Sequence, residues 1–370
     1  MAQTLPPSFS VVFTVMTATA NTNPPIFDGH NDVLLRLPQQ ERSFFEKGGR
    51  GHLDLPRALS GGFGGGFFAL YVPNPEEQWS EEAAISYTDK DYDIVPAPPL
   101  DTGLALRETL AAAARMFRIE RQSEGRVKVA RTAAEIEECL RDGVIAAVLH
   151  VEGAEAIGPE LDELEVLYQA GLRSLGPVWS RSNVFARGVP FRFPGSPDTG
   201  PGMTEAGRRL VRECGRLGIM IDLSHLNERG FWDVAKITGE PLVATHSNAH
   251  TLCPTTRNLT DRQLDAVRES GGMVGVNFAV AFLREDGREE PETPLSEIVR
   301  HVDYLVRRMG VDHVGLGSDF DGATIPRELG DAAGLPRLMG ALRERGYSDE
   351  ELRKLAHGNW LRVLRETWGG

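Results

Sequence analysis

Acidic and imidazole side chains follow five short apolar segments of this sequence. They are Asp28, His30 and Asp32; His150 and Glu152; Asp222 and His225; His246; and Asp319 and Asp321. Any one of them alone is equally well a buried residue with ordinary partners. Together, several carboxylates and imidazoles in one place would repel one another or lack hydrogen-bond partners unless a cation paired with them. Imidazole nitrogen and carboxylate oxygen suit zinc, so the set indicates a divalent metal site.

The spacing of these residues gives some of them separate tasks. His30 and Asp32 are two positions apart, so on a strand both side chains point to the same side. Two imidazoles from further segments, with an acidic bridge, make enough ligands for two metal ions. Asp222 and Asp321 are candidates for carboxylates that orient ligating imidazoles. His150 is interpreted as a structural histidine.

Eight short apolar segments, rich in β-branched residues, recur along the chain. They span residues 26–30, 67–72, 144–151, 172–178, 218–224, 241–247, 272–278 and 311–319. Most are continuously apolar, as expected for strands buried on both faces. Helical patterns lie between and after them, at residues 102–121, 132–141, 161–171, 204–218, 227–238, 260–267, 294–309, 336–345 and 348–366.

Strands that alternate with helices predict an α/β fold, a (β/α)8 TIM barrel in a single domain over residues 25–370. In such a barrel the active residues lie at the carboxyl ends of the strands, which is where the acidic and imidazole side chains occur. An open doubly wound sheet is the alternative, but no Gly-x-Gly-x-x-Gly motif lies at a strand–helix turn. Two long loops, Trp79–Leu100 and Gly188–Gly202, are candidate lids over the site.

The composition narrows the class of protein. Of 370 residues, 41% are hydrophobic and 25% charged, which is ordinary for a folded chain with a sizeable core. The net charge of −13 and the lack of a Lys/Arg-rich run argue against nucleic-acid binding. The three cysteines form no Cys-x-x-Cys pair, which argues against a disulfide framework or a cysteine zinc site. These features favour a reducing, cytoplasmic location.

The amino-terminal region is predicted to be a disordered tail over residues 1–24, with Met16 as an alternative initiator. Ser8–Ala20 is mildly apolar, but no Lys or Arg precedes it, so a weak signal peptide is the less favoured interpretation. No apolar run reaches the roughly 18–20 residues of a membrane span. The sequence leaves a homodimer open.

Seven motifs of this chain, taken in order, resemble one known family. They are FDGHND (27–32), GGFGGGFFALY (61–71), VEGAEAIG (151–158), IDLSH (221–225), THSNAH (245–250), TTRNLTD (255–261) and VGLGSDFDG (314–322). With LRVL (361–364), they resemble the membrane (renal) dipeptidase family, peptidase family M19 of the amidohydrolase superfamily. The resemblance covers residues 25–366. A His-x-Asp first motif and a bridging glutamate, in place of a carboxylated lysine, point to the dipeptidase branch and to a soluble bacterial-type member.

The resemblance implies an amidohydrolase-like barrel with two zinc ions per chain. Carried over residue by residue, His30, Asp32 and Glu152 would hold the first zinc. Glu152 would bridge to a second zinc, held by His225 and His246. A hydroxide between the two ions would be the nucleophile.

The resemblance also assigns the residues that meet the substrate. Asp319 would be the catalytic acid and base, and Arg257 would bind the carboxylate end of a dipeptide. Trp179 is a departure, because animal members carry a histidine there that contacts the scissile carbonyl. Trp179 either donates its one N–H to the carbonyl or reshapes the pocket. Arg181 is a less favoured candidate for a replacement cation.

The function that follows is hydrolysis of the peptide bond of dipeptides, including those with a C-terminal D-residue that some family members accept. Two alternatives stay open. One is a related hydrolase that acts on another amide or a lactam. The other is a catalytically inactive barrel that only binds metal.

Overall fold

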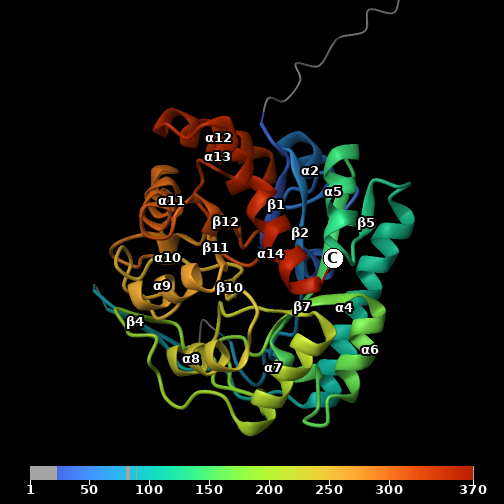
Figure 1. Ribbon diagram of the computed structural model, residues 1–370, viewed down its shortest axis with the longest axis vertical. Helices are drawn as coiled ribbons and strands as arrows, with labels where there is room; N and C mark the ends of the chain where they lie inside the picture. Colours follow the sequence, from blue (N-terminus) through green and yellow to red (C-terminus); the bar gives the residue numbers. More distant parts are fainter. Residues whose placement is uncertain (1–22, 81–83, 89, 370) are drawn as a thin grey trace, which may run out of the picture.

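Parallel strands followed by helices make up most of the chain (Figure 1). The computed structural model describes residues 23–80, 84–88 and 90–369. The tail predicted over residues 1–24 lies, up to residue 22, outside the described residues.

Two parallel sheets contain the predicted strands. The order of the larger sheet is β1 (Ile26–Asn31), β2 (Phe63–Tyr71), β6 (Ile145–Glu152), β7 (Leu172–Gly176) and β9 (Met220–Ile221). The smaller sheet consists of β10 (Val243–Ala244), β11 (Met273–Val276) and β12 (Val314–Leu316). Each of the eight predicted segments overlaps one of these strands. The short strand β5 (Val127–Val129), which pairs with the first half of β6, is not indicated by the sequence pattern.

Single bridges join the two sheets at both edges. Leu223 N donates to Val243 O at 2.9 Å beside a parallel bridge between Asp222 and Val243. Asp32 N donates to Phe320 O at 2.8 Å beside a parallel bridge between Asn31 and Phe320. The predicted α/β fold with parallel strands is therefore confirmed as a half-barrel sheet and a smaller sheet joined to it.

Helices lie outside the strands, where Figure 1 shows them surrounding the two sheets. They are α1 (Val33–Gln39), α2 (Leu55–Gly61), α4 (Thr102–Gln122), α5 (Ala133–Asp142), α6 (Asp162–Ala170), α7 (Glu205–Leu217), α8 (Glu228–Ile237), α9 (Asp261–Glu269), α10 (Val280–Leu283), α11 (Ser296–Met309), α12 (Leu335–Arg345), α13 (Asp349–Arg353) and α14 (Asn359–Trp368). Thr204 and Thr260 cap α7 and α9 by accepting backbone N–H groups. Among the described residues, no helix is both long and apolar enough to cross a membrane.

The core among the strands is closed by a side chain from the last helix. Trp360 of α14 is fully buried, and its ring lies 5.4 Å from that of Phe67 on β2. A Cβ at Gly315 would collide with Trp360, so glycine on β12 makes room for the indole. Phe67 in turn contacts His150, and His150 contacts His30. A tightly packed apolar layer thus supports the polar strand ends from below.

The two predicted lid loops pair with each other. Residues 79–100 contribute β3 (Ile85–Tyr87) and β4 (Tyr92–Ile94), and residues 188–202 contribute β8 (Arg192–Phe193). The three strands form an antiparallel sheet in which Tyr92 pairs with Phe193. The sequence predicts no strand in either loop, because segments of two or three residues carry no readable alternation.

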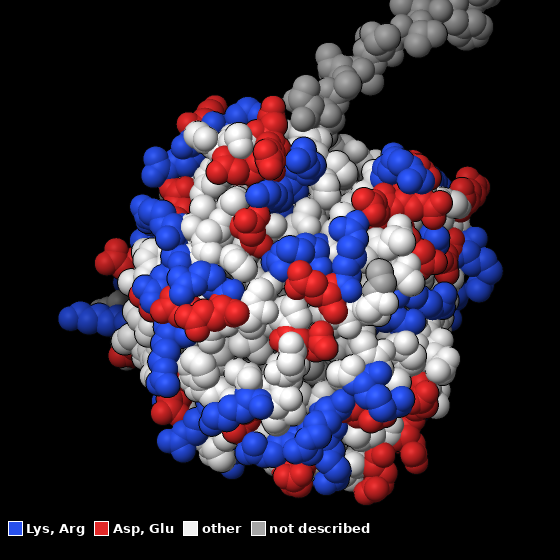
Figure 2. All heavy atoms as spheres, viewed as in Figure 1, with Lys and Arg blue, Asp and Glu red and all other residues white. Residues whose placement is uncertain are grey.

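Charges of both signs are interspersed over the face shown in Figure 2. Several charged side chains of the protein are paired, such as Arg365 with Glu137 at 2.7 Å. Interspersed charges limit any large field of one sign on this face.

Candidate metal centre and substrate cavity

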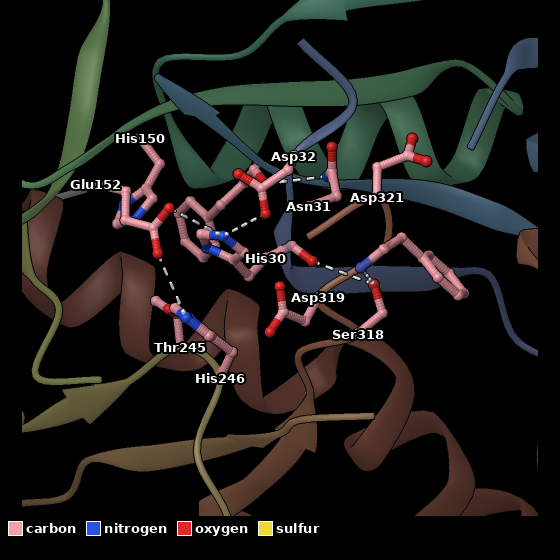
Figure 3. A network of polar contacts seen from close by, with 12 residues as sticks. His30, Asn31, Asp32, His150, Glu152, Thr245, His246, Ser318, Asp319 and Asp321 are labelled. Atoms are coloured by element: carbon pink, nitrogen blue, oxygen red, sulfur yellow. Dashed lines mark hydrogen bonds and ion pairs between the residues drawn. The ribbon is translucent and has the colours of Figure 1, made fainter. Parts of the chain in front are cut away.

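Three predicted ligands come from the ends of β1 and β6 and lie against one another. His30 and Glu152 are buried strand residues, and Asp32 directly follows β1. His30 Nε2 lies 3.3 Å from Asp32 Oδ2 and 3.5 Å from Glu152 Oε2 (Figure 3). The three side chains therefore point to one place, as the alternation along β1 predicts for His30 and Asp32.

The other two predicted ligands, His225 and His246, lie next to the second oxygen of the Glu152 carboxylate, Oε1. His225 Nε2 lies 2.9 Å from Glu152 Oε1, and His246 Nε2 lies 3.6 Å from it. The two Nε2 atoms are 3.0 Å apart. Glu152 thus stands between His30 on one side and His225 and His246 on the other.

Hydroxyl groups fix which nitrogen of each imidazole faces the centre. Thr245 Oγ1 donates to Asp222 Oδ2 at 2.7 Å and lies 2.8 Å from His246 Nδ1. Because the hydroxyl has one hydrogen, it accepts from His246 Nδ1–H, and the lone pair of His246 lies on Nε2. Ser180 Oγ lies 2.8 Å from His225 Nδ1, so it fixes the orientation of that ring and leaves Nε2 facing the centre. Asp222 therefore orients a histidine, as predicted, through Thr245.

The donor set fits a bound cation. With its Nδ1–H donated to Thr245, His246 directs the lone pair of Nε2 toward His225 Nε2 at 3.0 Å and Glu152 Oε1 at 3.6 Å. Arg257 Nη2 offers one N–H to His225 Nε2 at 3.3 Å. Buried acceptors that face one another are costly without a positive partner. Imidazole nitrogens and carboxylate oxygens in this arrangement suit Zn²⁺.

Burial shifts the pKa values of these groups against their charged forms. It raises the pKa of Glu152 to about 7, with the positive charge of His30 acting in the opposite direction. Burial also raises the pKa of Asp319. It lowers the pKa values of His225 and His246 well below the usual range, so both imidazoles are neutral near neutral pH.

Asp319 lies on the side of Asp32, after β12. A carboxylate oxygen of Asp319, a ring nitrogen of His30 and a carboxylate oxygen of Asp32 all lie within 4.8 Å of one another. Asn277 Nδ2 donates to Asp319 Oδ2 at 2.9 Å. The backbone of Asp319 is left-handed, with φ 59°, a conformation that non-glycine residues hold mainly where the surroundings impose it. A Cβ at Gly322 would collide with both the Asp319 and Asp32 carboxylates, so glycine there leaves them room.

A cavity of about 860 Å³ opens onto these groups. Asp32, Glu152, His225, His246 and Asp319 all line it. Arg257 also lines it and is buried, with Nη2 donating to His246 O at 3.2 Å and Nη1 to Ser224 O. The guanidinium carbon lies 5.3 Å from the ring centre of Phe282. The candidate metal ligands and the guanidinium of Arg257 thus line the same cavity.

Nearly the whole chain matches one family model. The model described as Membrane dipeptidase (Peptidase family M19) matches residues 17–368. The chain belongs to this family. It is 54% identical to the protein in the pqqA 5'region of Klebsiella pneumoniae over 277 residues, which are 74% of this chain and 99% of that protein.

Two solved structures of dipeptidase-type proteins are similar to this M19 chain throughout. A metallo peptidase from Rhodobacter sphaeroides, liganded with a phosphinate mimic of the dipeptide L-Ala-D-Ala, is 55% identical with a TM-score of 0.90. Dipeptidase AC, a metallo peptidase of family M19, is 55% identical with a TM-score of 0.88. The matches cover 94% of this chain and 100% of each of those chains.

Trp179, predicted above to replace a histidine of the animal members, lies in the cavity of this M19 chain. It lines the cavity, and its ring centre lies 6.0 Å from that of His225. Tyr71 and Phe191 pack against the indole at 5.2 and 5.5 Å. Trp79, from the loop before β3, meets it edge-on at 6.2 Å. Trp179 is therefore one side of an aromatic wall of the cavity.

Two sequence predictions are wrong in their detail. Arg181 is fully buried behind the Trp179 ring, bonded to Glu155 and Asn74, and does not line the cavity, so it supplies no replacement cation to the site. Asp321 does not orient a ligating imidazole. Its carboxylate accepts hydrogen bonds from Arg42 and from the backbone of His52, on the far side from the metal centre. His150, predicted to be structural, is fully buried with Ser174 Oγ 2.9 Å from its Nδ1, and it does not line the cavity.

Sequence reasoning missed the residues that support the centre. Ser180 and Thr245 orient imidazoles, and Asn277 holds Asp319. Each follows or ends a predicted strand segment. That position was the available signal, but hydroxyl and amide side chains are too common at strand ends to single these out.

Proposed function

We propose that this protein is a zinc-dependent dipeptidase with two Zn²⁺ ions per chain. The observation that carries the proposal is the arrangement of three imidazoles and the Asp32 carboxylate around Glu152, at the floor of a cavity that also holds Arg257. His30 and Asp32 would hold one ion with Glu152. His225 and His246 would hold the other, with Glu152 shared between them.

The chain's own residues supply the remaining chemistry. Zinc bound here would polarise the scissile carbonyl and lower the pKa of a water molecule. Asp319, whose pKa is raised by burial, takes the proton of that water and passes it to the leaving amine. Its position beside Asp32 and its bond from Asn277 hold its carboxylate at the cavity floor. Membership of a dipeptidase family supports this assignment.

Arg257 would set the length of the substrate. Two backbone carbonyls hold its guanidinium beside His225 and His246. A dipeptide ends in a carboxylate one residue past the scissile bond, and a guanidinium binds a carboxylate strongly. Trp179 and its aromatic neighbours would bound the side-chain pocket.

Substrates with a C-terminal D-residue are part of the proposal. The similar Rhodobacter sphaeroides protein carries a phosphinate mimic of L-Ala-D-Ala, which makes L-Ala-D-Ala the first dipeptide to assay. We also infer that the two sheets together form the closed eight-stranded barrel of the prediction, supported by the bridges at both edges. A cytoplasmic location and a homodimer stay predictions.

The test is a panel of substrates with zinc-loaded and chelated protein. The proposal expects hydrolysis of dipeptides, including L-Ala-D-Ala, that is lost on chelation and restored by Zn²⁺. Hydrolysis of lactams or cyclic amides without dipeptides would favour the related amidohydrolase. Zinc binding without hydrolysis of any of them would favour an inactive barrel.

A further inference from the structure

The loop that carries Asp319 has two left-handed residues that are not glycine. Asp319 has φ 59° and Asp321 has φ 68°. Asparagine, aspartate and glycine tolerate this region better than other residues, but aspartate does not prefer it over ordinary backbone. Such a conformation persists where contacts impose it. The loop therefore needs an anchor.

Asp321 is held at every polar atom by the segment from α1 to α2. Its Oδ2 accepts from Arg42 Nη2 at 2.8 Å, and its Oδ1 accepts from His52 N at 2.7 Å. Its N–H donates to His52 Nδ1 at 2.9 Å, and its carbonyl accepts from Arg36 Nε at 2.8 Å. The Asp321 side chain is fully buried and that of Arg42 is 5% exposed. Four bonds thus fix one residue of the loop.

The anchoring segment is itself shaped for close approach. Gly51, with φ 73°, lies beside the ion pair of Arg42 and Asp321. A Cβ at Gly51 would collide with the Arg42 guanidinium and with Asp321 Oδ1. Arg42 is in turn fixed, since its Nη1 donates to Leu53 O at 3.0 Å. Glycine is therefore suited to position 51 for two reasons: it adopts a positive φ without strain, and it has no Cβ to block the ion pair.

The loop is held to the metal centre at its other end. Asp319 N donates to His30 O at 3.0 Å, which ties the acid and base to the backbone of a proposed ligand. Asp319 and Asp321 are separated only by Phe320, whose ring is buried. In Figure 3 the Asp321 carboxylate points away from the metal centre while Asp319 points toward it. The anchored residue Asp321 is therefore separated from Asp319 by one residue, and its carboxylate lies on the side of the loop that faces away from the metal centre.

We propose that Asp321, with Arg42 and His52, is a positioning group that sets the placement of the Asp319 carboxylate. We call these three residues the loop clamp. The inference rests on the proposed function, in which Asp319 is the acid and base. Displacement of a catalytic group by about 1 Å can lower the rate by about 100-fold. The clamp therefore affects kcat, while metal binding and KM depend on other residues.

Two variants separate the clamp from the backbone conformation. Asp321→Gly keeps a left-handed residue but removes both side-chain bonds. Asp321→Asn also tolerates φ 68° and keeps an acceptor for His52 N, but loses the charge that faces Arg42. With zinc-loaded protein and L-Ala-D-Ala, we expect kcat about 10- to 100-fold lower for Asp321→Gly and a smaller loss for Asp321→Asn. Zinc per chain and KM should stay within about two-fold of wild type.

Arg42→Gln weakens the same clamp without replacing any residue of the loop. It provides a second test if the Asp321 variants do not fold. The proposal expects it to lower kcat with unchanged zinc content. Asp303→Asn is the control for loss of an arginine-paired carboxylate elsewhere, at a pair that is more exposed than the clamp. Asp303 on α11 likewise accepts from an arginine, Arg345, and from Tyr347 Oη, but has no contact with the loop. Its kcat should be that of wild type.

The outcomes distinguish this inference from the proposed function. Wild-type protein that hydrolyses no dipeptide contradicts the proposed function. Active wild type with near-normal kcat in Asp321→Gly, or in folded Arg42→Gln, contradicts the clamp alone. A loss of kcat that follows a loss of zinc, or that appears equally in Asp303→Asn, also overturns it, because either result assigns Asp321 to general stability.

Discussion

The floor and the roof of the cavity are built in different ways. The floor consists of side chains at the ends of parallel strands, such as His30 on β1 and Glu152 on β6, each buried and held by neighbours far apart in sequence. The roof includes Trp79 and Phe191, which come from two loops that pair over a short antiparallel sheet. Strand ends give fixed positions for ligands, whereas loops give a wall whose shape can vary among relatives with the same floor.

The sharpest way to break this comparison is to remove the proposed acid and base from the floor. Asp319→Asn should lower kcat about 10²–10⁴-fold, because general acid–base groups typically contribute that much. Zinc per chain should be unchanged. The measurement is steady-state kinetics with metal analysis on the same sample, and a variant with near-normal kcat would remove Asp319 from the mechanism.

The floor should also have a pH signature in the metal-free protein. The pKa of Glu152 rises from 4.5 to about 7 on folding, so its ionisation destabilises the folded state progressively as pH rises through that range. Metal-free Glu152→Gln lacks this group. It should gain stability relative to metal-free wild type between about pH 4.5 and 7, by up to about 3 kcal/mol. Denaturant unfolding of both proteins at several pH values checks this, and a pH-independent difference would contradict it.

Arg257 connects the floor to the substrate's end. Arg257→Met should cost about 1.5–3 kcal/mol in kcat/KM for free dipeptides, the range for a hydrogen bond to a charged group. C-terminally amidated analogues should lose little, since they lack the carboxylate. Equal losses for amidated and free dipeptides would end the anchor role, and with it the strongest reason to prefer dipeptides over other amides.

The smallest effect is expected in the roof. Arg192 on β8 pairs with Asp93 on β4 at 2.7 Å, but both side chains are about half exposed. Asp93→Asn should therefore change the free energy of unfolding by less than about 1 kcal/mol. Chemical denaturation gives the value. A larger loss would show that the roof sheet is as firmly built as the floor.

The same contrast explains what the sequence could predict. Apolar segments ending in His or carboxylate residues identify β1, β6 and the later strands, because burial on both faces leaves a continuous apolar pattern. The antiparallel pairing of Tyr92 with Phe193 depends on two segments about 100 residues apart in strands too short to show a period. Asp321 lies in the same motif as Asp319, and only the structure shows that it faces Arg42. Side-chain direction after a strand end depends on φ, which here is left-handed.

Metal stoichiometry tests the central claim most directly. Protein loaded with zinc and freed of excess ions should contain two Zn²⁺ per chain by mass spectrometry. Glu152→Gln should weaken both sites together, because Glu152 Oε1 faces His225 and His246 while Oε2 faces His30. One ion or none in the loaded wild type, or loss of a single ion in Glu152→Gln, would contradict a centre bridged by this carboxylate.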